Sequence, residues 1–308
     1  MSSPRVGVIG AGLMGHGIAQ VFAARGFEVR LQDVRTEALE RARSRIRSQL
    51  ELLGGGSSAL SRIQTTLSLG EAVEGAEFVF EAVPEDLDLK REIFRRVGEC
   101  ADPHAIVASN TSTLSVSAMG EGTRNPENHV IAHWFNPPYL IPVVEVVPGE
   151  RTSARTVDRT VSLLRDVGKE PVRVRREVPG FLVNRLQTAL LREALALLQA
   201  GVAEPEELDK AVRGSFGLRL AVVGPLETAD MGGLDLWLRG LRSLYPHLDN
   251  SREPQEILRE KVGRGDLGTA SGAGFFRYGD EARAAERSRD DRLLRLVRLL
   301  YSEDEQGR

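Results

Sequence analysis

The stretch RVGVIGAGLMG, residues 5–15, decides how the start of this chain folds. It opens with an apolar run typical of a buried strand, and a helical pattern follows over residues 16–25. Three glycines in the spacing G-x-G-x-x-G join the two. The first permits a tight turn, the second lets backbone approach a pyrophosphate, and the third lets the helix pack closely on the strand. The residues predicted to bind a dinucleotide here are Gly10, Gly12, Leu13, Met14 and Gly15.

A second predicted strand, residues 27–31, ends shortly before Asp33. An acidic residue at this distance from the glycines accepts hydrogen bonds from the adenosine ribose and repels a 2′-phosphate. The cofactor is therefore predicted to be NAD rather than NADP, although the nearby Arg35 leaves NADP open. Alternatively, Asp33 caps the helix that begins near Thr36.

The strand–helix alternation continues, which predicts an α/β fold with a doubly wound sheet of the Rossmann type. Residues 76–83 form a strand that leads to Glu85 and to Lys90 in the next helix. Residues 105–108 form another strand, and the polar run SNTS at 109–112 follows it. Doubly wound sheets bind ligands at the carboxyl ends of their strands, where these polar residues are expected.

The segment NHVIAHWFNPPYLIPVVEVVP, residues 128–148, contains two strand-like runs separated by a proline-rich turn. If the second run folds back on the first, Glu145 reaches the imidazole of His133. A carboxylate on one ring nitrogen fixes the tautomer and leaves the other nitrogen able to accept a proton near neutral pH. We interpret the pair as a base and the residue that orients it.

Two further polar residues each have two interpretations. Ser112 either caps the next helix or directs its hydroxyl into the crevice where nicotinamide and substrate meet. Asn184, near the start of a later apolar helix, is either a satisfied polar group between helices or a ligand contact.

The pattern becomes wholly helical after residue 178. We expect an NAD-binding domain over residues 1–178 and an all-α domain over 179–308, the latter contributing to the substrate crevice and to dimerisation. Its predicted helices cover residues 181–201, 206–213, 227–244 and 281–300. The first has apolar residues around much of its circumference, so it should be buried on several sides, within its own domain or in a homodimer.

Composition excludes several classes of function. The 308 residues carry a formal net charge of −3 with acidic and basic residues mixed, unlike a nucleic-acid-binding surface. No apolar run has membrane-spanning length and no signal segment is visible. The single cysteine, Cys100, fits a reducing compartment, so a cytoplasmic protein with no membrane partner is expected.

With these motifs in place, the sequence resembles the L-3-hydroxyacyl-CoA dehydrogenase family. The motifs that carry the resemblance, in order, are GAGLMG, EAVPED, SNTS, HWFNPP, VVE, PGFLVNR and SGAGFFRY. The resemblance implies an NAD-dependent dehydrogenase, as in fatty acid metabolism, that acts on a secondary alcohol. Other stretches are similar to the L-gulonate 3-dehydrogenase and lambda-crystallin branch: NPPYLIPVVEVVP, VDRT at 157–160 and GPLET at 224–228.

By this resemblance, His133 is the general base and Glu145 its partner. Ser112 and Asn184 would bind the substrate. The residues implied near the cofactor, beyond the glycine-rich loop and Asp33, are Glu85, Lys90, Asn110 and Asn136.

The resemblance leaves the small-molecule substrate open. A 3-hydroxyacyl-CoA is implied first, and SNTS is the version that acyl-CoA enzymes use. A free hydroxy acid such as L-gulonate is the alternative, because residues 36–68 lack the lysines that hold coenzyme A in the acyl-CoA enzymes. Arg41, Arg43, Arg45 and Arg47 could substitute for them. A noncatalytic, crystallin-like NAD-binding protein is the third possibility.

Overall fold

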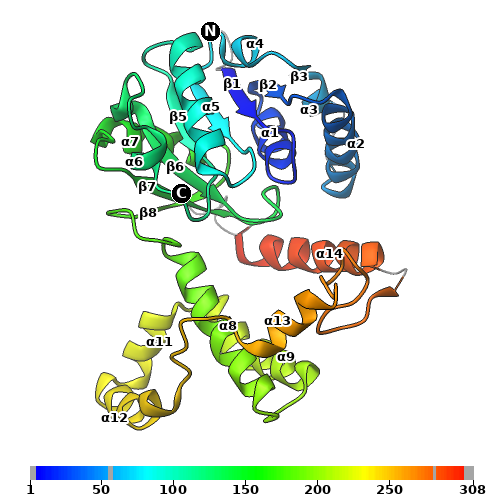
Figure 1. Cartoon of the computed structure of the whole chain (residues 1–308), viewed down its shortest axis with the longest axis vertical. Coiled ribbons are helices and arrows are strands. Elements are labelled where there is room, and N and C mark those ends of the chain that lie inside the picture. The colour runs from blue at the N-terminus through cyan, green and yellow to red at the C-terminus, as the bar shows by residue number, and fades with distance from the viewer. Residues whose placement is uncertain (1–4, 55–57, 280–281, 302–308) are drawn as a thin grey trace. The chain divides into compact units, whose positions relative to one another are not determined.

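The computed structural model describes residues 5–54, 58–279 and 282–301, and the chain divides into two compact units (Figure 1). The first unit is Met1–Arg185 and the second is Leu186–Arg308. The boundary expected at 178/179 from the sequence lies a few residues before this division. Helix α8 (Val183–Gln199) contains the division, because it begins in the first unit and ends in the second.

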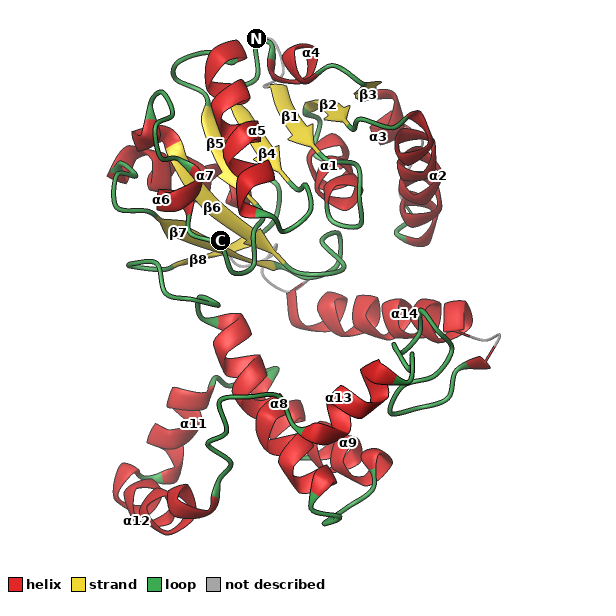
Figure 2. Cartoon of the chain, viewed as in Figure 1, coloured by secondary structure: helices red, strands yellow, loops and turns green. Residues whose placement is uncertain are grey.

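The first unit contains an eight-stranded sheet in the order β3-β2-β1-β4-β5-β6-β7-β8 (Figure 2). All neighbouring strands are parallel except β6 and β7, which are antiparallel. Helices connect the parallel strands, which confirms the predicted α/β doubly wound fold. The strands are β1 (Arg5–Ile9), β2 (Glu28–Gln32), β3 (Ile63–Thr66), β4 (Phe78–Glu81), β5 (Ile106–Ser109), β6 (His129–Trp134), β7 (Val143–Pro148) and β8 (Glu170–Arg173).

Two hydrophobic cores lie on the opposite faces of this sheet, because successive strand side chains point to alternate faces. Val6 and Val8 of β1 belong to one core and Ile9 to the other. The helices that close the first core are α1 (Gly15–Ala24), α2 (Thr36–Leu52), α3 (Ser58–Ser61) and α7 (Ala154–Asp166). Those that close the second are α4 (Leu69–Val73), α5 (Leu87–Cys100) and α6 (Val116–Met119). A short 3-10 helix, η1 (Pro126–Asn128), precedes β6.

The edge strand β3 has no clear signal in the sequence. Its first residue, Ile63, is 2% exposed, whereas Gln64 and Thr65 are exposed. One buried residue in four gives too short an alternation to predict a strand. The strand forms because its backbone pairs with β2 in parallel register from Val29↔Ile63 onward.

The second unit is helical, as predicted, and the described part of it has isolated bridges but no strand. The helix expected over residues 227–244 is two helices, so that prediction was wrong. Gly233 separates them with a φ of 87°, a left-handed conformation that glycine adopts readily. The helices after α8 are α9 (Pro205–Gly214), α10 (Phe216–Leu220), α11 (Pro225–Gly232), α12 (Leu234–Leu244), η2 (Tyr245–His247), α13 (Glu256–Gly263) and α14 (Ala282–Tyr301).

The expectation that α8 is buried on several sides is not met within this chain. Leu195 is 5% exposed, but Leu186 is 66% exposed and Leu191 is 50% exposed. None of the helices described is both long and apolar enough to cross a bilayer.

Candidate active site

The centre of the site is a histidine–glutamate pair formed by neighbouring strands. β6 and β7 pair in antiparallel register with His133 directly opposite Glu145. Ile131 and Val147, two residues away along each strand, belong to the core under α5, so both polar side chains point to that face. Glu145 Oε2 lies 2.8 Å from His133 Nδ1, and the two residues are 0% and 3% exposed. The fold-back suggested by the proline-rich turn is therefore present, and it fixes the pair through strand register.

Glu145 is also held by backbone. Its second oxygen, Oε1, accepts hydrogen bonds from Leu182 N at 2.8 Å and from Val183 N at 3.0 Å. Burial by itself would raise the pKa of the Glu145 carboxyl, but the hydrogen bonds from His133, Val183 and Leu182 outweigh it and lower the pKa. The carboxylate is thus kept ionised beside the imidazole.

The other ring nitrogen of His133 faces the substrate-binding candidates. Ser112 Oγ lies 3.2 Å from His133 Nε2. The side-chain amide of Asn184 donates to the carbonyl of Ser112 at 3.4 Å. Ser112 does not cap the following helix, because Ser115 is the N-cap of α6. The structure therefore brings together Ser112, His133, Glu145 and Asn184, four residues that are far apart in the sequence.

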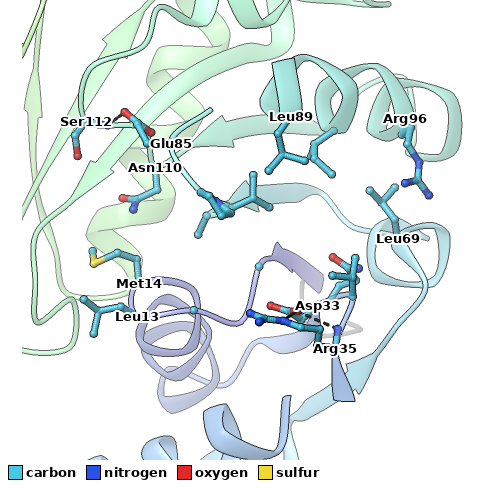
Figure 3. A pocket seen from close by; sticks show the side chains of 18 of the residues that line it. Leu13, Met14, Asp33, Arg35, Leu69, Glu85, Leu89, Arg96, Asn110 and Ser112 are labelled. Carbon is cyan, nitrogen blue, oxygen red and sulfur yellow. Dashed lines mark hydrogen bonds and ion pairs between the residues drawn. The ribbon is translucent and has the colours of Figure 1, made fainter. Parts of the chain in front are cut away.

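A cavity of about 850 Å³ lies at the carboxyl ends of β1, β2, β4 and β5. In Figure 3, Ser112, Glu85 and Asn110 lie at one end of it, and Leu69 and Arg96 lie at the other. Ser112 lines the cavity and also touches His133, so it connects the cavity to the histidine–glutamate pair. The predicted cofactor residues that line the cavity are Gly10, Gly12, Leu13, Met14, Asp33, Glu85 and Asn110.

The glycine-rich loop has the geometry that a pyrophosphate requires. At Gly10, φ is +95° and a Cβ would lie 2.7 Å from the carbonyl oxygen of Ala82. At Gly12 a Cβ would project into open space, with nothing within 4 Å among the described residues. The third glycine, Gly15, packs against Gly10, where an added Cβ would overlap the carbonyl oxygen. No described side chain caps the start of α1, which leaves that end available to an anion.

Asp33 lies beside this loop at the end of β2. Its Oδ2 accepts a hydrogen bond from Ala11 N at 3.0 Å and its Oδ1 accepts one from Arg35 N at 3.1 Å. Arg35, not Asp33, is the N-cap of α2, and that helix has no side-chain cap. The alternative that Asp33 caps the helix is therefore not what the structure shows, and the carboxylate lines the cavity instead.

Comparison with known proteins gives matches along nearly the whole described chain. The profile of the 3-hydroxyacyl-CoA dehydrogenase NAD binding domain matches residues 5–178, and that of the 3-hydroxyacyl-CoA dehydrogenase C-terminal domain matches residues 180–278. The chain belongs to the 3-hydroxyacyl-CoA dehydrogenase family. The resemblance read from the motifs is confirmed.

Three relatives within this family are similar over most of their length. A 5-formyl-3-hydroxy-2-methylpyridine 4-carboxylate 5-dehydrogenase of Mesorhizobium japonicum is 37% identical over 96% of this chain and 97% of its own. A solved structure of an enzyme of this name, described as an NAD+ dependent dismutase, aligns with a TM-score of 0.91 at 36% identity and covers 99% of both chains. Lambda-crystallin of Oryctolagus cuniculus is 42% identical over 74% of this chain and 75% of its own. A probable 3-hydroxybutyryl-CoA dehydrogenase of Deinococcus radiodurans is 35% identical over 89% of this chain and all of its own.

Membership of the 3-hydroxyacyl-CoA dehydrogenase family makes this chain an NAD-dependent dehydrogenase that acts on CH–OH groups. NAD is the cofactor, as predicted. The residues present fit it: the open space at Gly12, the start of α1 and the carboxylate of Asp33 are the features that a dinucleotide needs.

Within this family fold, Glu85 has contacts that the sequence does not reveal. Its Oε1 accepts hydrogen bonds from Thr111 Oγ1, Ser112 N, and the N and Oγ1 of Thr113, at 2.6–3.0 Å. Burial would raise the pKa of this carboxyl, but the Thr111 hydroxyl, the Lys90 ammonium and the other donors lower it. Glu85 thus fixes the turn that carries Ser112.

Lys90 lies beneath the cavity lining and is 1% exposed. Its Nζ is 2.7 Å from Glu81 Oε1 and 3.6 Å from Glu85 Oε2. The buried ammonium of Lys90 therefore forms an ion pair with Glu85 and helps to fix its carboxylate. Asn136, also predicted near the cofactor, is exposed in the turn after β6 and is not among the cavity-lining residues.

Asn110 accepts a hydrogen bond from Trp134 N through its side-chain oxygen at 2.9 Å. It therefore ties the end of β5 to the strand of His133.

Three residues that matter to the site were missed in the sequence. Glu81 is 0% exposed and accepts hydrogen bonds from Lys90 and from Ser109 Oγ. Phe181 lies edge-on to His133, with ring centroids 5.5 Å apart. Lys169 donates to two carbonyls of the turn after β6. The sequence does contain a signal for Glu81, because a charged residue at the end of the otherwise apolar strand FVFE indicates a buried carboxylate that needs a partner.

Proposed function

We propose that this dehydrogenase uses His133 as the general base that exchanges a proton with a secondary alcohol. The observation that carries the proposal is the continuous set of contacts from the cavity to the buried carboxylate. Ser112 Oγ is 3.2 Å from His133 Nε2, and Glu145 Oε2 is 2.8 Å from His133 Nδ1. A base in hydrogen-bond contact with both a substrate-side hydroxyl and an orienting carboxylate is the arrangement that proton transfer requires.

In the oxidation direction, His133 Nε2 takes the proton from the substrate hydroxyl. Glu145 accepts the hydrogen bond from Nδ1–H throughout, which fixes the tautomer and stabilises the imidazolium that forms. Ser112 donates to the substrate oxygen, and Asn184 holds the backbone of Ser112 in place. NAD, when bound, would supply the acceptor for the hydride that leaves the carbon bearing the hydroxyl. In reverse, His133 returns its proton while Ser112 stabilises the negative charge that develops on the carbonyl oxygen.

We propose a small hydroxylated carboxylic acid as the substrate class. Two relatives support this choice, since one is named for a pyridine carboxylate and another, of Streptomyces coelicolor, is named an L-carnitine dehydrogenase. Helix α2 and the residues up to 68 contain no lysine. In α2, the guanidinium of Arg43 donates a hydrogen bond to the carbonyl of Ile63, while the side chains of Arg41, Arg45 and Arg47 are exposed.

A 3-hydroxyacyl-CoA is the second candidate, because the Deinococcus radiodurans relative is named for 3-hydroxybutyryl-CoA and matches over its whole length. A panel that measures NADH formation with 3-hydroxybutyryl-CoA, 3-hydroxybutyrate and L-gulonate separates the two classes. Turnover with the free acids and not with the thioester supports the first. Absence of NADH formation with all three compounds would argue against both substrate classes and would favour the noncatalytic, crystallin-like alternative.

The role of His133 is tested with His133→Asn. We expect kcat to fall by about 10²- to 10⁴-fold, because the general base is lost, while NAD affinity is retained because the glycine-rich loop is untouched. Exposed His104 supplies the matched control, His104→Asn, which should keep full activity. Retention of wild-type kcat in His133→Asn would contradict the mechanism.

A further inference from the structure

The turn between β8 and α8 contains two consecutive residues in left-handed backbone conformation. Gly180 has a φ of 76° and Phe181 has a φ of 49°. The first is ordinary for glycine, but a bulky residue with positive φ is strained by its Cβ. Phe181 is nevertheless 1% exposed and well fixed, since its backbone N–H donates to the carbonyl of Val178 at 2.9 Å.

This strained turn delivers two backbone donors to Glu145. Leu182 N and Val183 N, the residues immediately after Phe181, lie 2.8 Å and 3.0 Å from Glu145 Oε1. The other carboxylate oxygen contacts His133 Nδ1. Both oxygens of a fully buried carboxylate are thus occupied, one by the imidazole and one by the turn.

The side chain of Phe181 approaches the same histidine. Its ring is 5.5 Å from the imidazole centroid with an interplanar angle of 65°, an edge-on contact. Phe181 therefore contributes to the His133–Glu145 pair in two ways. Its backbone conformation orients the N–H groups of Leu182 and Val183 toward Glu145, and its ring packs against His133.

We propose that Phe181 is a positioning residue for proton transfer at His133, acting through the left-handed turn that presents the amides of Leu182 and Val183 to Glu145. This inference rests on the proposed function of His133. A buried carboxylate without these donors would be incompletely paired, which is costly, and it would no longer have one fixed orientation toward the imidazole. Local strain that is retained at such a point serves to pre-organise the catalytic groups.

A matched pair of substitutions separates the backbone effect from loss of the ring. Phe181→Leu and Phe181→Ile remove the same phenyl group and add side chains of equal volume. Isoleucine alone is β-branched, so it opposes the left-handed φ more strongly. We expect kcat of Phe181→Ile to be lower than that of Phe181→Leu by about 10²-fold, the effect of a misplacement near 1 Å. KM for NAD should be the same in both.

A second pair tests the amides directly and does not depend on position 181. Val183 is the first residue of α8, where proline is well tolerated but carries no N–H. Val183→Pro removes the 3.0 Å donor to Glu145, whereas Val183→Ala keeps it. We expect kcat to fall in the first and not in the second, with equal KM for NAD. This pair decides the question if Phe181→Ile does not fold.

A spectroscopic readout keeps the inference separate from the proposed function. The proton between His133 Nδ1 and Glu145 should give a far-downfield resonance in the free protein, whether or not a substrate is known. We expect it to persist in Phe181→Leu and Val183→Ala and to shift or broaden in Phe181→Ile and Val183→Pro. Equal spectra and equal kcat within each pair would overturn the inference. Absence of the downfield resonance from the wild-type spectrum would overturn the inference as well. A wild-type resonance with no turnover on any substrate of the panel would instead contradict the proposed function.

Discussion

Lys169 shows how a single buried charge can hold the turn that follows the strand of His133. It is 8% exposed, and its Nζ donates to the carbonyls of Pro138 at 2.7 Å and Ile141 at 2.8 Å. The ammonium also lies 5.4 Å from the centroid of the Trp134 ring. Burial, with a smaller contribution from the charge of Arg25, lowers the pKa of Lys169 to about 8.

This pKa predicts a rise in stability at alkaline pH. Between about pH 8 and the ordinary lysine value near 10.4, the unfolded chain binds the proton that folded Lys169 has lost. The unfolding free energy should therefore increase with pH across this window, by on the order of 3 kcal/mol from this residue. The neutral amine retains two N–H groups for its two carbonyl partners, so the contacts survive.

Denaturant unfolding of the wild type and Lys169→Met, measured from pH 7 to 11, checks this prediction. The variant should lack the rise that Lys169 contributes. Lys210→Met is the control, since its side chain is 74% exposed. Parallel pH curves for the wild type and Lys169→Met would show that the buried amine is not titrating in this range.

Among single residues, the sequence identifies those whose chemistry is local and misses those whose role depends on a distant partner. His133 and Glu145 could be paired because a turn between two short strands restricts their register. Phe181 could not be recognised, because a phenylalanine beside a glycine does not reveal a left-handed φ. Lys169 was missed because its two carbonyl partners come from the 137–141 turn, about 30 residues earlier in the chain.

The glycine-rich loop predicts two different outcomes for the same chemical change. Gly10→Ala places a methyl group 2.7 Å from the Ala82 carbonyl oxygen in a residue with a φ of +95°. It should destabilise the first unit by about 1–3 kcal/mol, as expected for a side chain forced into a strained backbone region. Gly12→Ala meets open space, so its stability should be close to that of the wild type.

The methyl group of Gly12→Ala projects into the space that we assign to the pyrophosphate, so its effect should appear in cofactor binding. We expect a higher dissociation constant for NAD in Gly12→Ala, with an unchanged melting temperature. Calorimetric titration with NAD and thermal unfolding measure the two quantities. Normal NAD affinity in a well-folded Gly12→Ala would argue against this placement of the cofactor.

Among the helices and strands, long periodic elements were predicted well and short or interrupted ones were not. The parallel strands of β1, β4 and β5 and the helices between them follow from their apolar patterns. Edge strand β3 forms through pairing with β2, information that its four residues do not contain. The break at Gly233 lies inside a continuous helical pattern, and an isolated glycine is often tolerated in a helix.

For the whole molecule, the second unit has less of a core than its length requires. Among its described side chains, Leu195 is the one buried hydrophobic residue. By contrast, every large hydrophobic residue of α12 except Leu241 is 40–62% exposed: Leu234, Leu236, Trp237, Leu238 and Leu244. Apolar surface on this scale marks an interaction site on a stable protein. We propose that a second copy of the chain covers it, since the net charge of −3 is small and the face is apolar.

Light scattering coupled to size-exclusion chromatography should therefore report a dimer for the wild type. Leu234→Glu combined with Leu238→Glu places two charges on one face of α12, at spacing i, i+4, and should shift the protein to monomer, because burying an unpaired charge in the interface costs several kcal/mol. Ser243→Glu, at an exposed position on the opposite side of the same helix, is the control and should stay dimeric. A wild-type monomer at micromolar concentration, with the same melting temperature at every dilution, would instead mean that α12 is not a subunit interface, since a dimer must lose stability on dilution.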